Sequence, residues 1–205
     1  MSRTTRISRG ALAIALTASI FTAGCTGAGI LVGAAATTGV SVAQERTTRQ
    51  ALTDAEISIR INNALLNEDA ALFRDVSLEV VEGRVLLTGA VETPEDRIRA
   101  AEIVWATPDV IELLNEIQVG DGGGVQGFAE DVWISAQLRT ALLTDVDVNA
   151  VNYNIETIGG TVHLIGVAKT EEELVHVVEI ARGVPGVKQV VSHILTKNDE
   201  RRVAG

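Results

Sequence analysis

The sequence contains few of the residues that form covalent links, aromatic cores or basic surfaces. Of its 205 residues one is cysteine and three are proline, and aromatic residues make up 3%. A single cysteine excludes a disulfide within the chain. The formal net charge of −10 argues against nucleic acid as a partner, because a protein that binds a polyanion needs a basic face. The hydrophobic fraction of 46% is ample for folding, so we expect aliphatic cores.

The chain contains one structural unit twice. Residues 54–119 align with residues 131–196 at a constant shift of 77 positions and without a gap. In the clearest stretch, apolar residues alternate with variable ones between two glycines. The positions that recur are mostly apolar or turn-forming, which is typical of a shared core and not of a shared active site. The glycines that bracket the stretch in the two copies are Gly83, Gly89, Gly160 and Gly166.

The period of hydrophobicity changes within each copy and predicts the order helix, strand, strand, helix, strand. The two strands in the middle are expected to form a hairpin that turns at residues 82–83 in the first copy and 159–160 in the second. Glycine at these turns permits positive φ. The last strands are expected at residues 110–119 and 187–196.

Four polar side chains are interpreted as helix starts. Asp54 and Asp131 suit the start of the first helix in each copy, because the exposed backbone N–H groups there bind an acceptor. Thr93 and Thr170 are each followed by an acidic turn and are expected to cap the second helices.

Residues 1–24 resemble a lipoprotein signal peptide, with a basic start followed by an uncharged run. The tetrapeptide at residues 22–25, Thr-Ala-Gly-Cys, resembles a bacterial lipobox. Its chemistry is thioether attachment of a diacylglycerol to Cys25, after which cleavage leaves Cys25 as an acylated N-terminus. Apart from this covalent lipid we expect no cofactor.

A second cleavage site remains open, because the small residues before Gln44 permit cleavage after Ala43, which would release a protein without the lipid. Under the first interpretation, residues 25–50 form a lipidated N-terminus and a tether of small residues. Removal of the signal peptide takes three arginines away and changes the formal charge from −10 to −13.

The order of elements, with glycines bracketing the second strand of the hairpin, resembles the BON domain, which implies an α+β fold. Two such units behind a lipobox are similar to the dual-BON outer-membrane lipoproteins that bind anionic phospholipid at division sites. In each unit the resemblance implies a small three-stranded sheet packed by two helices. The expected segments are a signal peptide at 1–24, the tether at 25–50, a BON domain at 51–119, a Gly-rich linker at 120–129, a second BON domain at 130–198 and a tail at 199–205.

The resemblance also implies a function without catalysis. We expect an outer-membrane lipoprotein that faces the periplasm, binds anionic phospholipid such as phosphatidylglycerol, supports envelope integrity and contacts envelope or division proteins. The alternative is a soluble or anchored periplasmic adaptor, or a chaperone-like factor, that holds proteins on its hairpins and sheet faces.

Family resemblance places the phospholipid contact on the first helix of the second copy. Trp133 lies about 100° around this helix from Ile134, and its counterpart in the first copy is Glu56. Tryptophan suits a bilayer interface, because it combines a large apolar body with one N–H donor. The alternative is that Trp133 packs between the domains beneath the linker. The residues expected to share its face or flank are Val132, Ala136, Gln137, Arg139 and Thr140.

The three histidines, His163, His176 and His193, all lie in the second copy. No closely spaced cysteine or second ligand accompanies them, so the sequence predicts neither a metal site nor a catalytic histidine. His163 and His193 are expected to point away from the apolar face of their strands.

Overall fold

The computed structural model describes residues 47–120 and 124–202 of the chain. The expected signal peptide, Cys25, the alternative cleavage site after Ala43 and most of the expected tether lie outside the described residues.

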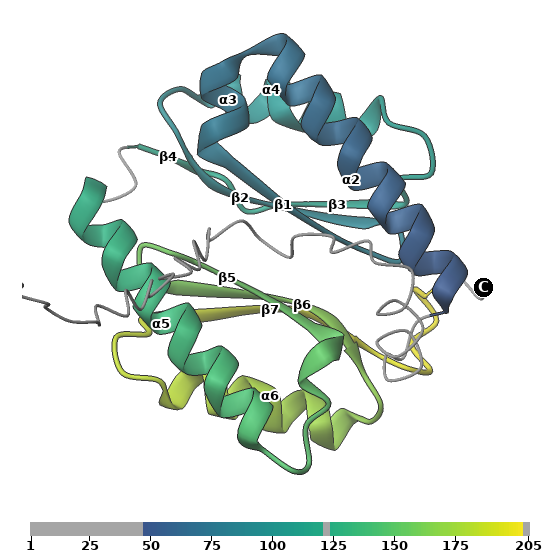
Figure 1. Ribbon diagram of the computed structural model, residues 1–205, viewed down its shortest axis with the longest axis vertical. Coiled ribbons are helices and arrows are strands. Elements are labelled where there is room, and N and C mark those ends of the chain that lie inside the picture. Colours follow the sequence, from purple (N-terminus) through teal and green to yellow (C-terminus); the bar gives the residue numbers. More distant parts are fainter. Residues whose placement is uncertain (1–46, 121–123, 203–205) are drawn as a thin grey trace, which may run out of the picture. The chain divides into compact units, whose positions relative to one another are not determined.

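The first domain places two helices and a short third helix on one face of a small sheet (Figure 1). Strand β2 is central: β1 pairs with it in antiparallel fashion, and β3 and β4 pair with it in parallel. The elements in chain order are α2 (Thr48–Glu68), α3 (Ala70–Asp75), β1 (Val76–Val81), β2 (Arg84–Val91), α4 (Pro94–Trp105), β3 (Glu112–Asn115) and β4 (Gln118–Val119).

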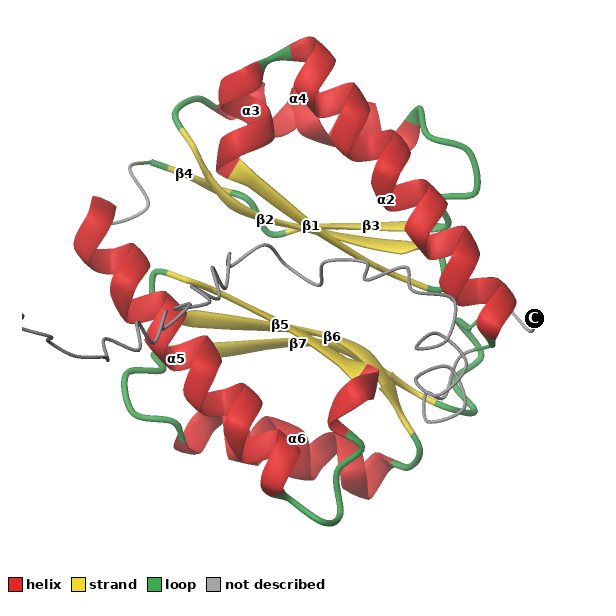
Figure 2. Ribbon diagram, viewed as in Figure 1, coloured by secondary structure: helices red, strands yellow, loops and turns green. Residues whose placement is uncertain are grey.

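The second domain repeats this arrangement, and its two α-helices lie on one face of a three-stranded sheet (Figure 2). Strand β6 is central, antiparallel to β5 and parallel to β7. The elements are α5 (Gly124–Thr144), η1 (Ala150–Asn152), β5 (Tyr153–Ile158), β6 (Thr161–Ala168), α6 (Glu171–Gly183) and β7 (Gln189–Thr196). The predicted α+β class and the predicted order of elements are confirmed in both copies.

Two features of the first domain differ from the prediction. The chain between the first helix and the hairpin forms the short helix α3, which Asp69 caps by accepting a hydrogen bond from the N–H of Ala71 at 2.6 Å. The last strand is interrupted, because β3 ends at Asn115 and β4 begins at Gln118. At the interruption Ile117 is buried in the core.

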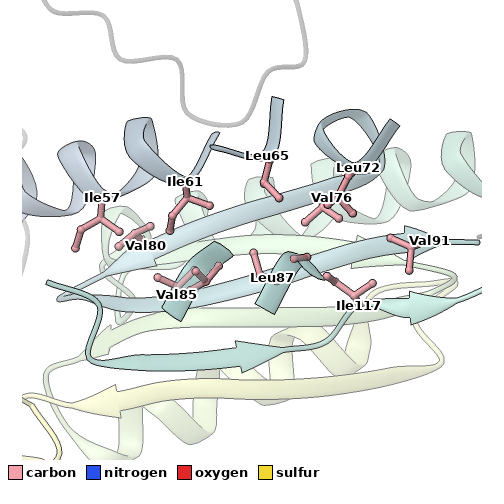
Figure 3. Close-up of a cluster of buried hydrophobic side chains, with 12 residues drawn as sticks. Ile57, Ile61, Leu65, Leu72, Val76, Val80, Val85, Leu87, Val91 and Ile117 are labelled. Atoms are coloured by element: carbon pink, nitrogen blue, oxygen red, sulfur yellow. The ribbon is translucent and has the colours of Figure 1, made fainter. Parts of the chain in front are cut away.

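Each domain has its own aliphatic core between the helices and the sheet. In the first domain the core side chains point from α2 and α3 toward the strands (Figure 3). They include Ile57, Ile61, Leu65, Leu72, Val80, Val85 and Leu87. The matching side chains of the second domain include Ile134, Leu138, Leu142, Ile155, Val162 and Leu164.

Asp54 and Asp131 do not start helices, and here the sequence interpretation was wrong. Helix α2 begins six residues before Asp54, and Thr47 caps it by accepting a bond from the N–H of Gln50. Asp54 lies inside the helix, 3% exposed, and its carboxylate accepts the backbone N–H groups of both turn residues of the β1–β2 hairpin at 2.9 Å. Asp131 accepts the N–H groups of the β5–β6 turn in the same way, at 2.7 and 2.8 Å. Thr93 and Thr170 cap α4 and α6 as predicted.

Helix α5 begins at Gly124, inside the segment expected to be linker. A glycine costs a helix about 1 kcal/mol relative to alanine, so composition favoured a linker here. The packing that stabilises the helix lies further along it, at Ile134, Leu138 and Leu142, whereas Phe128 and Ala129 are exposed.

The glycines that end the repeated stretch are required by close backbone contact. A Cβ atom on Gly89 would lie 2.1 Å from the carbonyl oxygen of Asp75, and one on Gly166 would lie 2.2 Å from that of Asn152. Gly83 and Gly160 occupy the hairpin turns at φ of 73° and 81°, where a side chain would be strained.

The sheet faces that carry no helices contact each other. Val81 and Leu86 of the first domain form a buried cluster with Ile165 and Val167 of the second, and Leu114 packs against it. Polar bonds surround the cluster. The amide of Asn154 donates to Glu79 at 2.6 Å, His193 Nε2 lies 3.0 Å from Glu116, and Arg202 donates to both carboxylate oxygens of Glu82 at 2.6 and 2.8 Å.

His163 points toward this interdomain contact, away from the core of its own domain, as predicted. Its side chain is 2% exposed, and neither ring nitrogen has a hydrogen-bond partner among the described residues. Burial lowers the pKa of His163; the carboxylate of Glu116 raises it and His193 lowers it further. The fold therefore favours the neutral imidazole.

Candidate functional site

Helix α5 presents two faces of different character. Ile134, Leu138 and Leu142 recur at helical spacing and are 3%, 0% and 1% exposed, so they fix the inner face of the helix on the sheet. Buried Asp131 also lies on this side and holds the hairpin turn. The rotation of the helix about its axis is therefore fixed.

The outer face of α5 is mostly apolar and carries one charged side chain, Arg139, near its edge. Trp133 is 53% exposed, and Phe128 and Leu143 are 66% and 64% exposed. At about 100° per residue these positions fall within a single band along the helix. We call this band the α5 strip; its residues are Phe128, Ala129, Val132, Trp133, Ala136, Thr140 and Leu143.

Most of the residues predicted for this site lie on the strip or beside it. Val132, Trp133, Ala136 and Thr140 are exposed on the strip. Gln137 lies at its edge, half-buried, and its amide nitrogen is covered and has no partner among the described residues.

Arg139 is exposed and, at about 100° per residue, falls between Phe128 and Val132 near one edge of the strip. Its charge acts on Glu156 of β5: burial raises the pKa of the Glu156 carboxyl, and Arg139 lowers it. Arg139 is therefore close enough to β5 to attract the Glu156 carboxylate, and it can also attract an anionic ligand outside the helix.

Sequence reasoning missed Phe128 and Leu143. Phe128 was placed in the expected linker, and Leu143 was not among the residues expected to contact lipid. Their spacing would have found them, since Phe128 precedes Val132 by four residues and Leu143 follows Ala136 by seven, which keeps all of them on one side of a helix.

The equivalent helix of the first domain has a different outer face. Helix α2 also exposes apolar side chains, namely Leu52, Ile59 and Leu66. Between them, however, Glu56 and Arg60 form an ion pair at 2.6 Å. This charged pair occupies the place that Trp133 and Gln137 take on α5, so only the second domain has uncharged side chains at these two positions.

The alternative prediction, that Trp133 packs between the domains, does not agree with its exposure. The described contacts between the domains come from the sheets and from Arg202, whereas more than half of the Trp133 side chain is exposed.

The described residues bring no three histidine, cysteine, aspartate or glutamate side chains together as a metal-binding group. Two of the histidines have single carboxylate partners: His176 lies 3.0 Å from Asp145, and His193 lies 3.0 Å from Glu116. Within 47–120 and 124–202, the helices fall short of the length and hydropathy that a membrane span requires.

Comparison with known proteins gives several matches. The BON domain matches residues 53–121 and 130–198. An uncharacterised protein of Anaplasma centrale, from the gshII 5′ region, is 39% identical over 150 residues, which are 73% of this chain and 98% of the relative. Osmotically-inducible protein Y of Escherichia coli is 27% identical, over 94% of this chain and 97% of the relative. Outer membrane lipoprotein DolP of Haemophilus influenzae is 28% identical, over 88% of this chain and 92% of the relative.

Proposed function

Because the chain belongs to the BON-domain family and contains two BON domains in tandem, we propose that it is a non-catalytic, lipid-anchored envelope protein whose second BON domain binds anionic phospholipid. The observation that carries this proposal is the α5 strip, an exposed and largely apolar helix face with Trp133 at 53% exposure. A solvent-exposed apolar patch typically marks a site of interaction with a protein or a membrane.

The relatives support the location in the envelope. One of them is named an outer membrane lipoprotein and matches 88% of this chain. Together with the lipobox at Cys25, this similarity supports an anchor in the outer membrane with both domains facing the periplasm. In this position the α5 strip meets the surface of the bilayer that holds the anchor.

The two attachments complement each other physically. A mature chain with a charge of −13 is repelled by an anionic bilayer, although salt limits this repulsion to separations of about 10 Å or less. The anchor on Cys25 overcomes this repulsion by holding the domains close to the surface. Durable attachment commonly combines an acyl anchor with a second, weaker contact, and burial of Trp133 would supply that contact.

Flotation with vesicles tests the lipid contact. Both cores lie within the described residues, and so do the bonds from Asp54 and Asp131 to the hairpin turns. Residues 45–205 therefore retain the folded domains without the anchor. We expect this fragment to float with phosphatidylcholine vesicles that contain phosphatidylglycerol. Trp133→Ala should lower the partition coefficient about tenfold or more, because burial of a large apolar side chain contributes about 1.5–3 kcal/mol.

Trp105 provides the matched control, because it is 58% exposed in the first domain. Trp105→Ala should leave flotation unchanged. A fragment that does not float with these vesicles, or that floats equally well after Trp133→Ala, would show that the α5 strip does not bind lipid.

The anchor is tested separately in the full-length chain. Metabolic labelling with palmitate should mark the protein and disappear in Cys25→Ser, since a thioether needs the cysteine sulfur. Labelling that persists in the variant would place the lipid elsewhere, and an unlabelled parent protein would favour cleavage after Ala43.

The first domain favours a second candidate function, the binding of envelope or division proteins. The sheet faces predicted for this adaptor role are covered, by helices on one side and by the other domain on the other. Its helices nevertheless expose Ile59, Ile98 and Trp105 at 54%, 58% and 58%. A protein partner would therefore dock on helices α2 and α4.

A further inference from the structure

A recess of about 380 Å³ opens beside Trp133 in the second domain. Its walls come from the start of α5, the β5–β6 turn and the turn before β7. The volume lies within the range of about 300–1,000 Å³ that is usual for small-ligand sites. Four of the lining residues leave only backbone at the wall: Gly127, Gly159, Gly160 and Gly186.

Lys188 supplies one fixed positive charge to the recess. Its Nζ donates a hydrogen bond to the carbonyl oxygen of Gly159 at 2.9 Å. Its aliphatic stem lies against Gly160, where an added Cβ would come within 3.0–3.1 Å of three stem carbons. An ammonium has three donors, so the bond to Gly159 leaves capacity for an anionic ligand.

The equivalent positions in the first domain have the opposite charge character. At four equivalent positions the second domain has three uncharged residues and the ammonium of Lys188, whereas the first domain has three carboxylates and an aliphatic side chain. All three carboxylates have arginine partners, since Glu56 pairs with Arg60 and Glu82 with Arg202, each at 2.6 Å, and Asp109 lies 3.6 Å from Arg60. The first-domain residues that replace Trp133, Gly159, Gly186 and Lys188 are Glu56, Glu82, Asp109 and Ile111.

Two carboxylates in the recess narrow the class of ligand. Asp131 is already bonded to the N–H groups of Gly159 and Gly160. Glu130 is exposed at the wall and accepts hydrogen bonds but donates none when ionised. A ligand that fits therefore carries an anionic group for Lys188 and a hydrogen-bond donor for Glu130.

We propose that the recess binds the headgroup of a glycerophospholipid, with the phosphate at Lys188 and a headgroup hydroxyl donating to Glu130. This rests on the proposed function, because the α5 strip brings the recess to the bilayer, where Trp133 both enters the membrane and walls the recess. The strip would give affinity for any bilayer, and the recess would give the preference for phosphatidylglycerol, whose glycerol supplies the hydroxyls.

The test compares binding of residues 45–205 to phosphatidylcholine vesicles with and without phosphatidylglycerol. Gly159→Glu and Lys188→Ile place first-domain residues in the recess and leave Trp133 intact. The fold accepts a glutamate at this turn, because Glu82 has φ of 56° where Gly159 has 61°. Both variants should lose about tenfold or more of their binding to phosphatidylglycerol vesicles, the equivalent of one charge-assisted bond, and lose less of their binding to phosphatidylcholine, whose headgroup has no hydroxyl for Glu130.

Lys169→Ile is the matched control, because Lys169 is also exposed in the second domain but follows the opposite end of β6. It should change binding less than twofold. If the lysines acted only through diffuse attraction to the membrane surface, each lysine variant would lose binding to a similar extent, roughly fivefold. That result would contradict the proposal that the recess binds the headgroup.

The remaining outcomes separate the two proposals. If the parent fragment binds neither vesicle, the proposed lipid contact itself fails. If Trp133→Ala abolishes binding while Gly159→Glu and Lys188→Ile retain the preference for phosphatidylglycerol, only the recess fails. Soluble glycerol 3-phosphate at millimolar concentration should not displace the fragment from vesicles; full displacement would show that the recess takes a free phosphate compound and not a lipid.

Discussion

Gly89→Ala is expected to destabilise the first domain by about 3–5 kcal/mol, a large part of the stability of a small domain. The new Cβ would lie 2.1 Å from the carbonyl oxygen of Asp75, which is backbone and has no rotamer to relieve the overlap. Overpacking of this kind costs about 1–3 kcal/mol, and the φ of 118° adds strain of about 1–3 kcal/mol for any residue with a side chain.

Chemical denaturation monitored by hydrogen exchange would locate this loss, since amides of β1 and β2 should lose protection while those of β5 and β6 keep it. Gly166→Ala should give the reverse pattern, because its Cβ would lie 2.2 Å from the carbonyl oxygen of Asn152. Gly183→Ala is the control: an added Cβ meets nothing within 4 Å, so stability should stay the same or rise. If Gly89→Ala and Gly183→Ala unfold at the same denaturant concentration, the close contact between Gly89 and the backbone of Asp75 does not exist.

Asp131→Ala is expected to cost about 3 kcal/mol in the second domain. The carboxylate accepts the N–H groups of Gly159 and Gly160 at 2.7 and 2.8 Å, and bonds to a charged acceptor contribute about 1.5–3 kcal/mol each. Alanine would leave both turn amides without this acceptor in a buried place. Urea denaturation measures the loss, and exchange of the two turn amides should accelerate.

Asp54→Ala should have the same effect on the hairpin of the first domain, because the bonds are repeated at 2.9 Å. Asp54→Asn keeps one acceptor oxygen and should recover part of the loss. Glu56→Ala removes a carboxylate two residues further along the same helix whose side chain is 62% exposed, and an exposed pair of this kind contributes only about 0.3–0.5 kcal/mol. If Asp54→Ala and Glu56→Ala lower the free energy of unfolding equally, the Asp54 carboxylate does not hold the hairpin turn.

Much of the fold could be read from the sequence because the duplication supplied two samples of each pattern. Many positions that are apolar in both copies, such as Ile57 with Ile134, are buried in the core, whereas the matched Leu66 and Leu143 are exposed. The turn at Glu82-Gly83 and the caps at Thr93 and Thr170 follow from local chemistry that needs no partner distant in the chain.

Features that depend on distant partners were missed for a physical reason. Asp54 and Asp131 have the composition of a helix cap, and only the tertiary fold shows that each accepts N–H groups 28 and 29 residues away. His163 points away from its own core as expected, but its burial comes from the first domain, which periodicity within one strand does not reveal.

The candidate site was predictable only in part. The replacement of Glu56 by Trp133 was visible in the alignment of the two copies, and it identified the helix. The length of the strip and the recess beside it were not, because both depend on where α5 begins and on which glycines of separate turns come together.

The insertion of Trp133 into a bilayer is measured most directly by its fluorescence. Trp105→Phe leaves Trp133 as the single tryptophan of residues 45–205, and Trp133→Phe leaves Trp105. With vesicles that contain phosphatidylglycerol and brominated acyl chains, Trp133 emission should shift to shorter wavelength and be quenched, while Trp105 emission should stay unchanged. Equal quenching of both tryptophans, or none for Trp133, would contradict the assignment of the second BON domain as the lipid-binding one.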